Sequence, residues 1–96
     1  MTVTLPTCLD GPALEALRPV ILAAVLEPTE RVVVLDAADV ELISSAGLGL
    51  LVAAAMIGAE RGVRLEVSRP SPLFRRSLSL TGLGRHLGLT AEPALV

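Results

Sequence analysis

The sequence predicts an α/β domain, because strand-like and helix-like patterns alternate along the chain with short connections. Residues 32–35 are an apolar, β-branched run that is typical of a central strand, covered on both faces or nearly so. Residues 42–59 carry no charge and favour a helix that begins at Ser44 or Ser45. Residues 63–67 alternate between apolar and charged side chains, which indicates a strand with one solvated face.

The amino-terminal part predicts a strand followed by a helix. Residues 2–5 alternate between hydroxyl and apolar side chains, which indicates a short strand at the start or edge of a sheet, and Pro6 ends it. Asp10 is expected to cap a helix whose leucines and isoleucine recur at helical spacing. Pro19 lies inside this pattern and predicts a kink or a split, and Pro28 closes it.

The carboxyl-terminal part predicts one more helix. Residues 68–72 contain two prolines and favour a turn, and residues 73–81 follow with helical spacing up to a glycine. Residues 84–96 fit either a short helix or a terminal strand. A chain of 96 residues has the length of one small domain, so we expect a single domain over residues 1–96.

The composition excludes several function classes. One Phe and no Tyr or Trp leave no platform for base stacking, and a net charge of −2 argues against nucleic-acid binding. The single Cys8 excludes an internal disulfide and a cysteine-based metal cluster, and no secretory signal opens the chain, so cytoplasmic residence is expected. Serines, glycines and acidic flanks interrupt the uncharged run at residues 42–59, so no membrane insertion is expected.

The candidate site is the junction where an acidic loop meets the uncharged helix. A hydroxyl or phosphate at Ser44 or Ser45 would meet unpaired N–H groups and the positive end of the helix dipole. Asp36 and Asp39 suggest paired carboxylates for a metal or acid–base site, but no histidine lies near them, so turn solvation is the preferred interpretation. No residues assemble a nucleophile, a base and an oxyanion site, so we expect no enzyme activity, no metal and no cofactor.

Four segments in order match a family pattern. They are Leu9-Asp10 before the first helix, residues 32–36 as a strand, Ile43-Ser44-Ser45-Ala46-Gly47-Leu48-Gly49 at the start of the next helix, and Leu80-Thr81-Gly82-Leu83 at the end of a third. With these segments the chain resembles the STAS domain, which is found in anti-sigma factor antagonists and in the cytoplasmic domains of sulphate transporters. The resemblance implies a small single-layer mixed β-sheet with alternating helices, here with the N-terminal strand shortened or missing.

The resemblance also implies a function. Antagonists of this family are bacterial transcription regulators whose serine, one residue after an Asp, is phosphorylated by a partner anti-sigma factor with kinase activity. Ser45 matches that serine, Ser44 stands in the place of the Asp and is the less favoured acceptor, and ATP would bind to the partner. The implied partner-binding residues are Asp10, Asp36, Asp39, Ser44, Ser45, Ala46, Gly47, Leu48 and Leu51.

Two alternatives stay open. The loss of the family's Asp at Ser44 favours a STAS subunit that is never phosphorylated and supports a permanent complex, with the ATPase of a lipid-transport system or within a chemosensory array. An edge strand left unpaired at the amino terminus favours association, so a homodimer is a further alternative.

Overall fold

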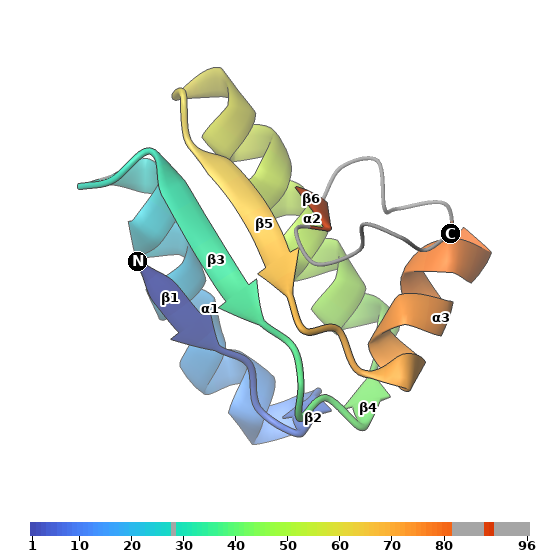
Figure 1. The fold of residues 1–96 in the computed structure, drawn as a ribbon. Coiled ribbons are helices and arrows are strands. Elements are labelled where there is room, and N and C mark those ends of the chain that lie inside the picture. Colours follow the sequence, from blue (N-terminus) through green and yellow to red (C-terminus); the bar gives the residue numbers. More distant parts are fainter. Residues whose placement is uncertain (28, 82–87, 90–96) are drawn as a thin grey trace.

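A computed structural model describes residues 1–27, 29–81 and 88–89 of the chain. The elements in order are β1 (Thr2–Thr4), β2 (Cys8–Leu9), α1 (Gly11–Leu26), β3 (Val32–Asp36), β4 (Leu42–Ile43), α2 (Ser45–Glu60), β5 (Arg64–Ser68), α3 (Pro72–Thr81) and β6 (Gly88–Leu89) (Figure 1). The predicted α/β class is confirmed, and helices alternate with the three longer strands of the sheet as expected.

The strands form two parallel sheets. The main sheet has the order β1-β3-β5-β6, and β2 and β4 form a separate pair. All of these pairings are parallel, so antiparallel pairs of the mixed sheet that the resemblance implies are not seen among the described residues. The expected short amino-terminal strand is confirmed as β1, which spans three residues at one edge of the sheet.

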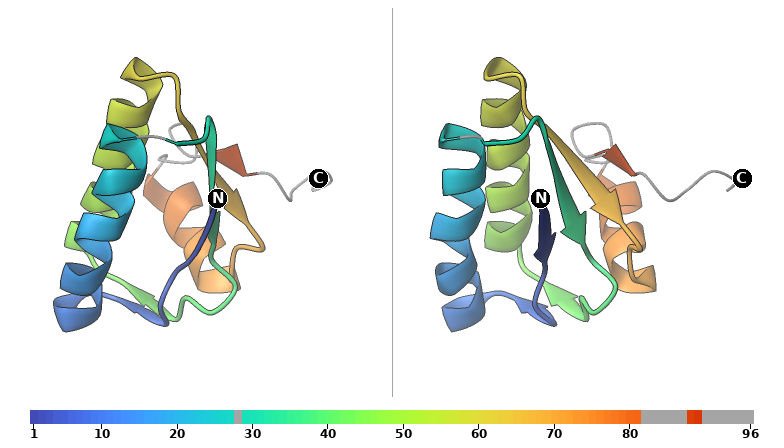
Figure 2. Two further views of the ribbon diagram at one scale, coloured as in Figure 1. Left: turned by 90° about the vertical axis from the view of Figure 1, so that its left-hand side faces the viewer. Right: turned by 60° about the vertical axis from the view of Figure 1, so that its left-hand side comes forward.

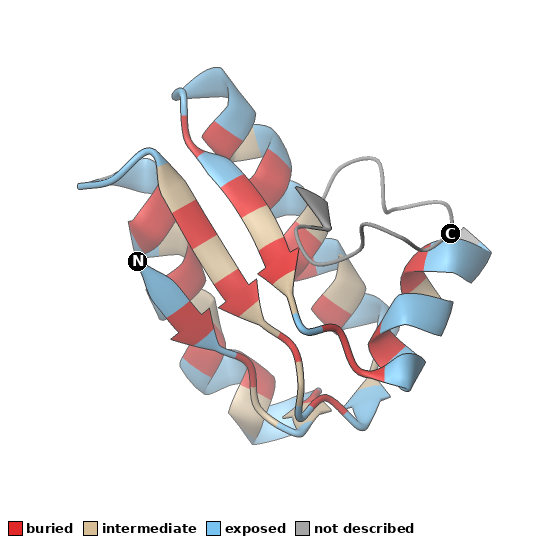
Figure 3. Cartoon of the chain, viewed as in Figure 1, coloured by how far each residue is buried: buried red, intermediate tan, exposed pale blue. Residues whose placement is uncertain are grey.

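The core lies between the main sheet and helices α1 and α2, which pack on the same face of the sheet (Figure 2). Alternate strand residues point into this core, with Val33 and Leu35 on β3 and Val67 on β5 almost fully buried (Figure 3). The other face of β3 is only half-buried at Val32 and Val34. The expectation that this strand is covered on both faces or nearly so is therefore met in full on one face only, because no described helix lies over the second face (Figure 1).

A single helix α1 spans Gly11–Leu26 with Pro19 inside it, so of the two expected effects of this proline, a kink or a split, the split is wrong. Proline removes one backbone hydrogen bond, but Pro19 lies on the exposed side of the helix, where water can solvate the freed carbonyl. Leu14, Ile21 and Val25 are buried on the opposite side and hold the helix against the core.

Helices α2 and α3 lie close to their predicted bounds. Helix α3 is anchored by Ser71, whose buried hydroxyl donates to the Val40 carbonyl at 2.7 Å and accepts from the Phe74 N–H at 3.1 Å. Of the ambiguous residues 84–96, Gly88 and Leu89 pair with β5, so the strand alternative holds for these two residues. The other residues of that range, and Gly82 and Leu83 of the family segment, lie outside the described part of the chain.

Candidate functional site

The short strands β2 and β4 bring the amino-terminal ends of α1 and α2 together. Their register pairs Leu9 with Ile43, so the next residues along each strand, Asp10 and Ser44, lie next to each other. Asp10 and Ser44 are the N-cap residues of α1 and α2. Two candidate residues that are far apart in the sequence therefore share one end of the helical layer.

Ser44 is built into the fold at this junction. Its hydroxyl donates to the Leu9 carbonyl at 3.1 Å and accepts from the Gly47 N–H at 3.1 Å, which is the geometry of a helix N-cap. The Leu9 carbonyl also accepts from the Ser44 N–H at 3.2 Å. Both hydrogen-bonding functions of the Ser44 hydroxyl are thus occupied. By contrast, Asp10 occupies an N-cap position without a side-chain cap hydrogen bond, so its expected capping role is not fulfilled through its carboxylate.

Gly47 is required by the close packing of α2 against β2. A Cβ atom at this position would lie 2.6 Å from the Leu9 carbonyl oxygen, which is closer than real Cβ contacts allow. The glycine therefore allows the first turn of α2 to reach the strand that precedes α1. Gly49, two residues further along and exposed, has no atom within 4 Å of such a position.

Ser45 differs from Ser44 in every respect that matters for modification. It is the first residue of α2, it is exposed, and its hydroxyl makes no hydrogen bond to any described residue. The N–H groups of Ser45 and Ala46 likewise have no partner within the described part of the chain, as is usual for the first turn of a helix. A group attached to the Ser45 oxygen can point into solvent without disturbing the cap.

Exposed residues on one side of α2 form a surface that begins at Ser45. We call this surface the outer face of α2; it consists of Ser45, Ala46, Gly49, Ala53 and Met56, which follow one another at helical spacing. Met56 is 55% exposed, and Leu42 in the preceding strand is 48% exposed. The surface is therefore uncharged and composed of small and apolar side chains.

Two predicted binding residues do not reach this surface. Leu51 is 0% exposed and belongs to the core, which corrects the expectation that it contacts a partner directly. Gly47 is also buried, so its role is the close packing described above rather than partner contact. Leu48 is half-buried at the side of the helix.

The predicted acidic residues have different environments. Asp36 is half-buried, accepts from the Arg69 guanidinium at 2.6 Å and accepts from the Ala38 N–H at 3.1 Å. The bond from Arg69, and to a smaller extent the bond from Ala38, lowers the pKa of Asp36 from its ordinary value of 3.8. Asp36 is thus engaged within the domain, whereas Asp39 and Asp10 are exposed and available to a partner.

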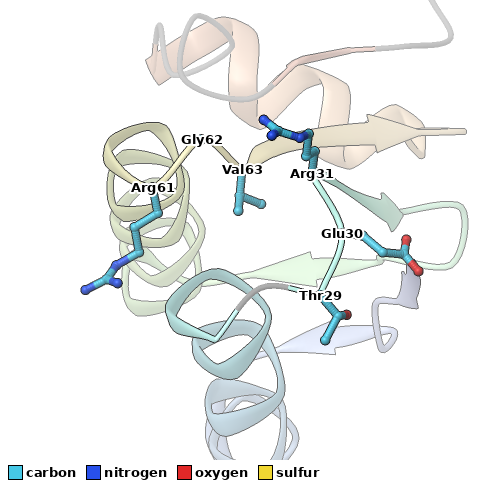
Figure 4. A pocket seen from close by; sticks show the side chains of 6 residues that line it. All are labelled: Thr29, Glu30, Arg31, Arg61, Gly62 and Val63. Atoms are coloured by element: carbon cyan, nitrogen blue, oxygen red, sulfur yellow. The ribbon is translucent and has the colours of Figure 1, made fainter.

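A separate hollow of about 320 Å³ lies at the other end of the sheet, where β3 and β5 begin (Figure 4). Arg31 and Arg61 line it, but their side chains point away from each other and do not converge on a common position. Val63 points into the hollow. The hollow is separated from Ser45 by the full length of α2 and takes no part in the candidate site.

The described residues contain no group of three or more His, Cys, Asp or Glu side chains with the spacing of a metal site. Among the same residues, no helix combines the length and the hydropathy that a membrane crossing demands. His86 lies outside the described part of the chain.

The sequence analysis missed the β2–β4 pair, the role of Ser71 and the partner of Asp36. Ser71 carries a local signal, since a serine followed by proline and preceding a helical pattern is a typical N-cap. Strands of two residues are too short for a periodicity signal, and nothing local links Arg69 to Asp36 over 33 positions.

Comparisons with known proteins agree with this arrangement. The family model described as "Mlab, STAS domain" matches residues 1–91. The structure of the anti-sigma factor antagonist SpoIIAA in its unphosphorylated form matches with a TM-score of 0.76 and 23% sequence identity, over 96% of this chain and 80% of that chain. A comparison with curated protein sequences finds no significant match. Since the family model spans nearly the whole sequence and the solved structure has the same fold, the chain belongs to the STAS domain family.

Proposed function

We propose that this chain is a partner-switching regulator of the anti-sigma factor antagonist type. In the unmodified state it binds a kinase-type anti-sigma factor through the outer face of α2 and the neighbouring Asp10 and Asp39. The partner binds ATP and transfers a phosphoryl group to the Ser45 hydroxyl, and the modified chain is released. The proposed setting is the bacterial cytoplasm, with transcription as the controlled process.

The observation that carries this proposal is the difference between the two serine hydroxyls, of which one is hydrogen-bonded within the fold and the other is exposed. Ser44 has both hydrogen-bonding functions of its hydroxyl occupied by the fold, and Ser45 has an exposed hydroxyl without a described partner. The family's Asp at position 44 would also be a good N-cap residue, so Ser44 retains the capping function and lacks only the charge. This supports Ser45 as the acceptor despite the departure from the family pattern.

The chemistry of the surface supports release after phosphorylation. A phosphate adds a charge of about −1.5 to −2 and three acceptor oxygens. The free N–H groups at the start of α2 accommodate this charge, so the fold is expected to persist. A partner packed on the uncharged outer face would bury that charge or meet it with its own acidic groups, and each loss of about 1.4 kcal/mol weakens binding tenfold.

The alternative is a permanent STAS subunit that is never phosphorylated, held by an ATPase of lipid transport or by a chemosensory array. The length of the outer face favours this alternative, because exposed Ala53 and Met56 extend it for about three turns beyond Ser45. A partner could use those turns without approaching the hydroxyl of Ser45.

The first test is phosphopeptide mass spectrometry of the protein recovered from its native cells under growth and stress conditions. Trypsin releases residues 32–61 as one peptide in which Ser44 and Ser45 are the only hydroxyl residues, and fragment ions between them assign the site. Phosphate on Ser45 supports the switch. Phosphate confined to Ser44 contradicts Ser45 as the acceptor. No phosphate at complete peptide coverage contradicts the switch and favours the permanent subunit.

The second test uses purified proteins. Binding of the chain to the anti-sigma factor kinases of the native organism is measured by calorimetry with ADP in place of ATP, so that Ser45 stays unmodified. Ser45→Asp is expected to lose binding while keeping its circular dichroism spectrum. Ser79→Asp is the matched control, because it adds the same charge at an exposed position on α3 and is expected to bind normally. Equal binding by both variants would contradict the switch.

A further inference from the structure

Within residues 1–27, 29–81 and 88–89, strand β1 has one side of its backbone unpaired. It is an edge strand of the main sheet, and its pairing partner among the described residues is β3 (Figure 1). The Met1 carbonyl and the Leu5 N–H bond to β3 at 2.8 and 2.9 Å. Because backbone groups alternate in direction along a strand, the N–H and C=O groups of Thr2 and Thr4 face outward.

An apolar groove of about 370 Å³ lies beside this open edge, between β1 and α1. Its lining includes Val3, Pro6, Ala13, Ala16, Leu17 and Val20. Val20 is 45% exposed although it belongs to this apolar lining. An exposed apolar groove next to unpaired strand groups is the pattern expected where a sheet continues into another polypeptide.

The charged side chains Glu15 and Arg18 of α1 lie outside this groove. Glu15 and Arg18 pair with each other at 3.4 Å. Neither residue lines the groove, and at helical spacing both point to a different side of α1 from Val20. A second copy of the chain can therefore approach through the groove without bringing like charges together, despite its net charge of −2.

We propose that this edge pairs with a second copy of the chain to form an antiparallel homodimer. With the twofold axis at Val3, Thr2 of each copy lies opposite Thr4 of the other, and each pair exchanges both N–H···O=C bonds. The two main sheets then form one continuous sheet. Both α1 helices lie on the same face of it, with the small side chains of Ala13 and Ala16 at the contact.

The short edge favours a folded second copy over an extended peptide. Only two residues of β1 face outward, so a flexible peptide would be ordered in exchange for very few hydrogen bonds. A second copy brings a strand that is already ordered and an identical apolar groove. The groove is lined by β1, Pro6 and α1, so the dimer leaves the outer face of α2 accessible and does not depend on the proposed function.

Sedimentation velocity of the full chain over a hundredfold range of concentration tests this proposal. The average mass is expected to rise from one chain to two. Val20→Glu places a carboxylate in the groove of each copy and is expected to keep the chain monomeric over the same range. Leu26→Glu is the matched control, because Leu26 is 42% exposed on the same helix but outside the groove, and this variant should still dimerise.

Amide hydrogen exchange tests the location of the contact without any variant. When nine-tenths of the chains are dimeric, the Thr2 and Thr4 amides should exchange about tenfold more slowly than in dilute solution. A chain that stays monomeric throughout overturns the proposal. A dimer that survives Val20→Glu, or one whose Thr2 and Thr4 amides exchange at the monomer rate, also overturns it.

Discussion

The replacement Ser44→Ala tests whether the junction between β2 and α2 depends on one hydroxyl. The variant removes the N-cap hydrogen bond from Gly47 and the bond that the hydroxyl donates to the Leu9 carbonyl. The carbonyl keeps the Ser44 N–H as a donor at 3.2 Å, so it is not left without a partner. The N–H of the buried Gly47, by contrast, loses its acceptor, so the cost is the loss of two partly buried hydrogen bonds with one donor left without its partner.

The magnitude follows from these two contacts. Loss of a serine N-cap costs about 1 kcal/mol, within a range of about 0.5–2 kcal/mol. A net contribution of about 0.5–1.5 kcal/mol is typical of one further hydrogen bond. We therefore expect the free energy of unfolding to fall by about 1.5–2.5 kcal/mol, and the midpoint of thermal unfolding to fall by about 6–20 °C for a domain of this size.

Urea unfolding followed by circular dichroism measures this loss, with the slope of the transition expected to stay unchanged. Ser45→Ala is the matched control, because its exposed hydroxyl makes no described hydrogen bond, and its effect should stay within about 0.5 kcal/mol. A loss below about 0.5 kcal/mol for Ser44→Ala, or an equal loss for Ser45→Ala, would refute the assignment of the cap to Ser44.

Two further predictions concern the same end of the domain. Gly47→Ala should destabilise the fold by about 1–3 kcal/mol because its Cβ would meet the Leu9 carbonyl, whereas Gly49→Ala should stabilise it by about 0.5–1 kcal/mol. Urea unfolding measures both changes, and equal signs for the two variants would contradict the packing argument. Arg69→Gln should raise the pKa of Asp36 toward its ordinary value of 3.8 in an NMR titration of the carboxyl group. A pKa that is lower in the folded state than in the unfolded state stabilises the fold at pH values above the ordinary pKa. Arg69→Gln should therefore lower the free energy of unfolding at neutral pH, and this loss should shrink as the pH falls below about 3.9. An unchanged pKa of Asp36 would contradict the role of the ion pair.

The sequence alone determined the elements whose signals are local. The β-branched run before Asp36 predicted β3, the serines before an uncharged run predicted the start of α2, and Pro72 lies where a new helix begins. These signals are local because helix caps, prolines and side-chain periodicity act over a few residues. The family segment around Ser45 was equally readable, since its motif is contiguous.

The tertiary structure decided which residues meet and which are accessible. The sequence predicted Leu51 as a contact residue, but burial of α2 against the sheet places it in the core. The family motif already favoured Ser45 over Ser44 as the acceptor, but only the approach of Leu9 shows that the fold uses the Ser44 hydroxyl while Ser45 stays exposed. The pairing of β2 with β4 joins residues that are 34 positions apart and carries no periodic signal. Local preferences select helices and strands, whereas long-range packing and hydrogen bonding determine which hydroxyl is available for chemistry.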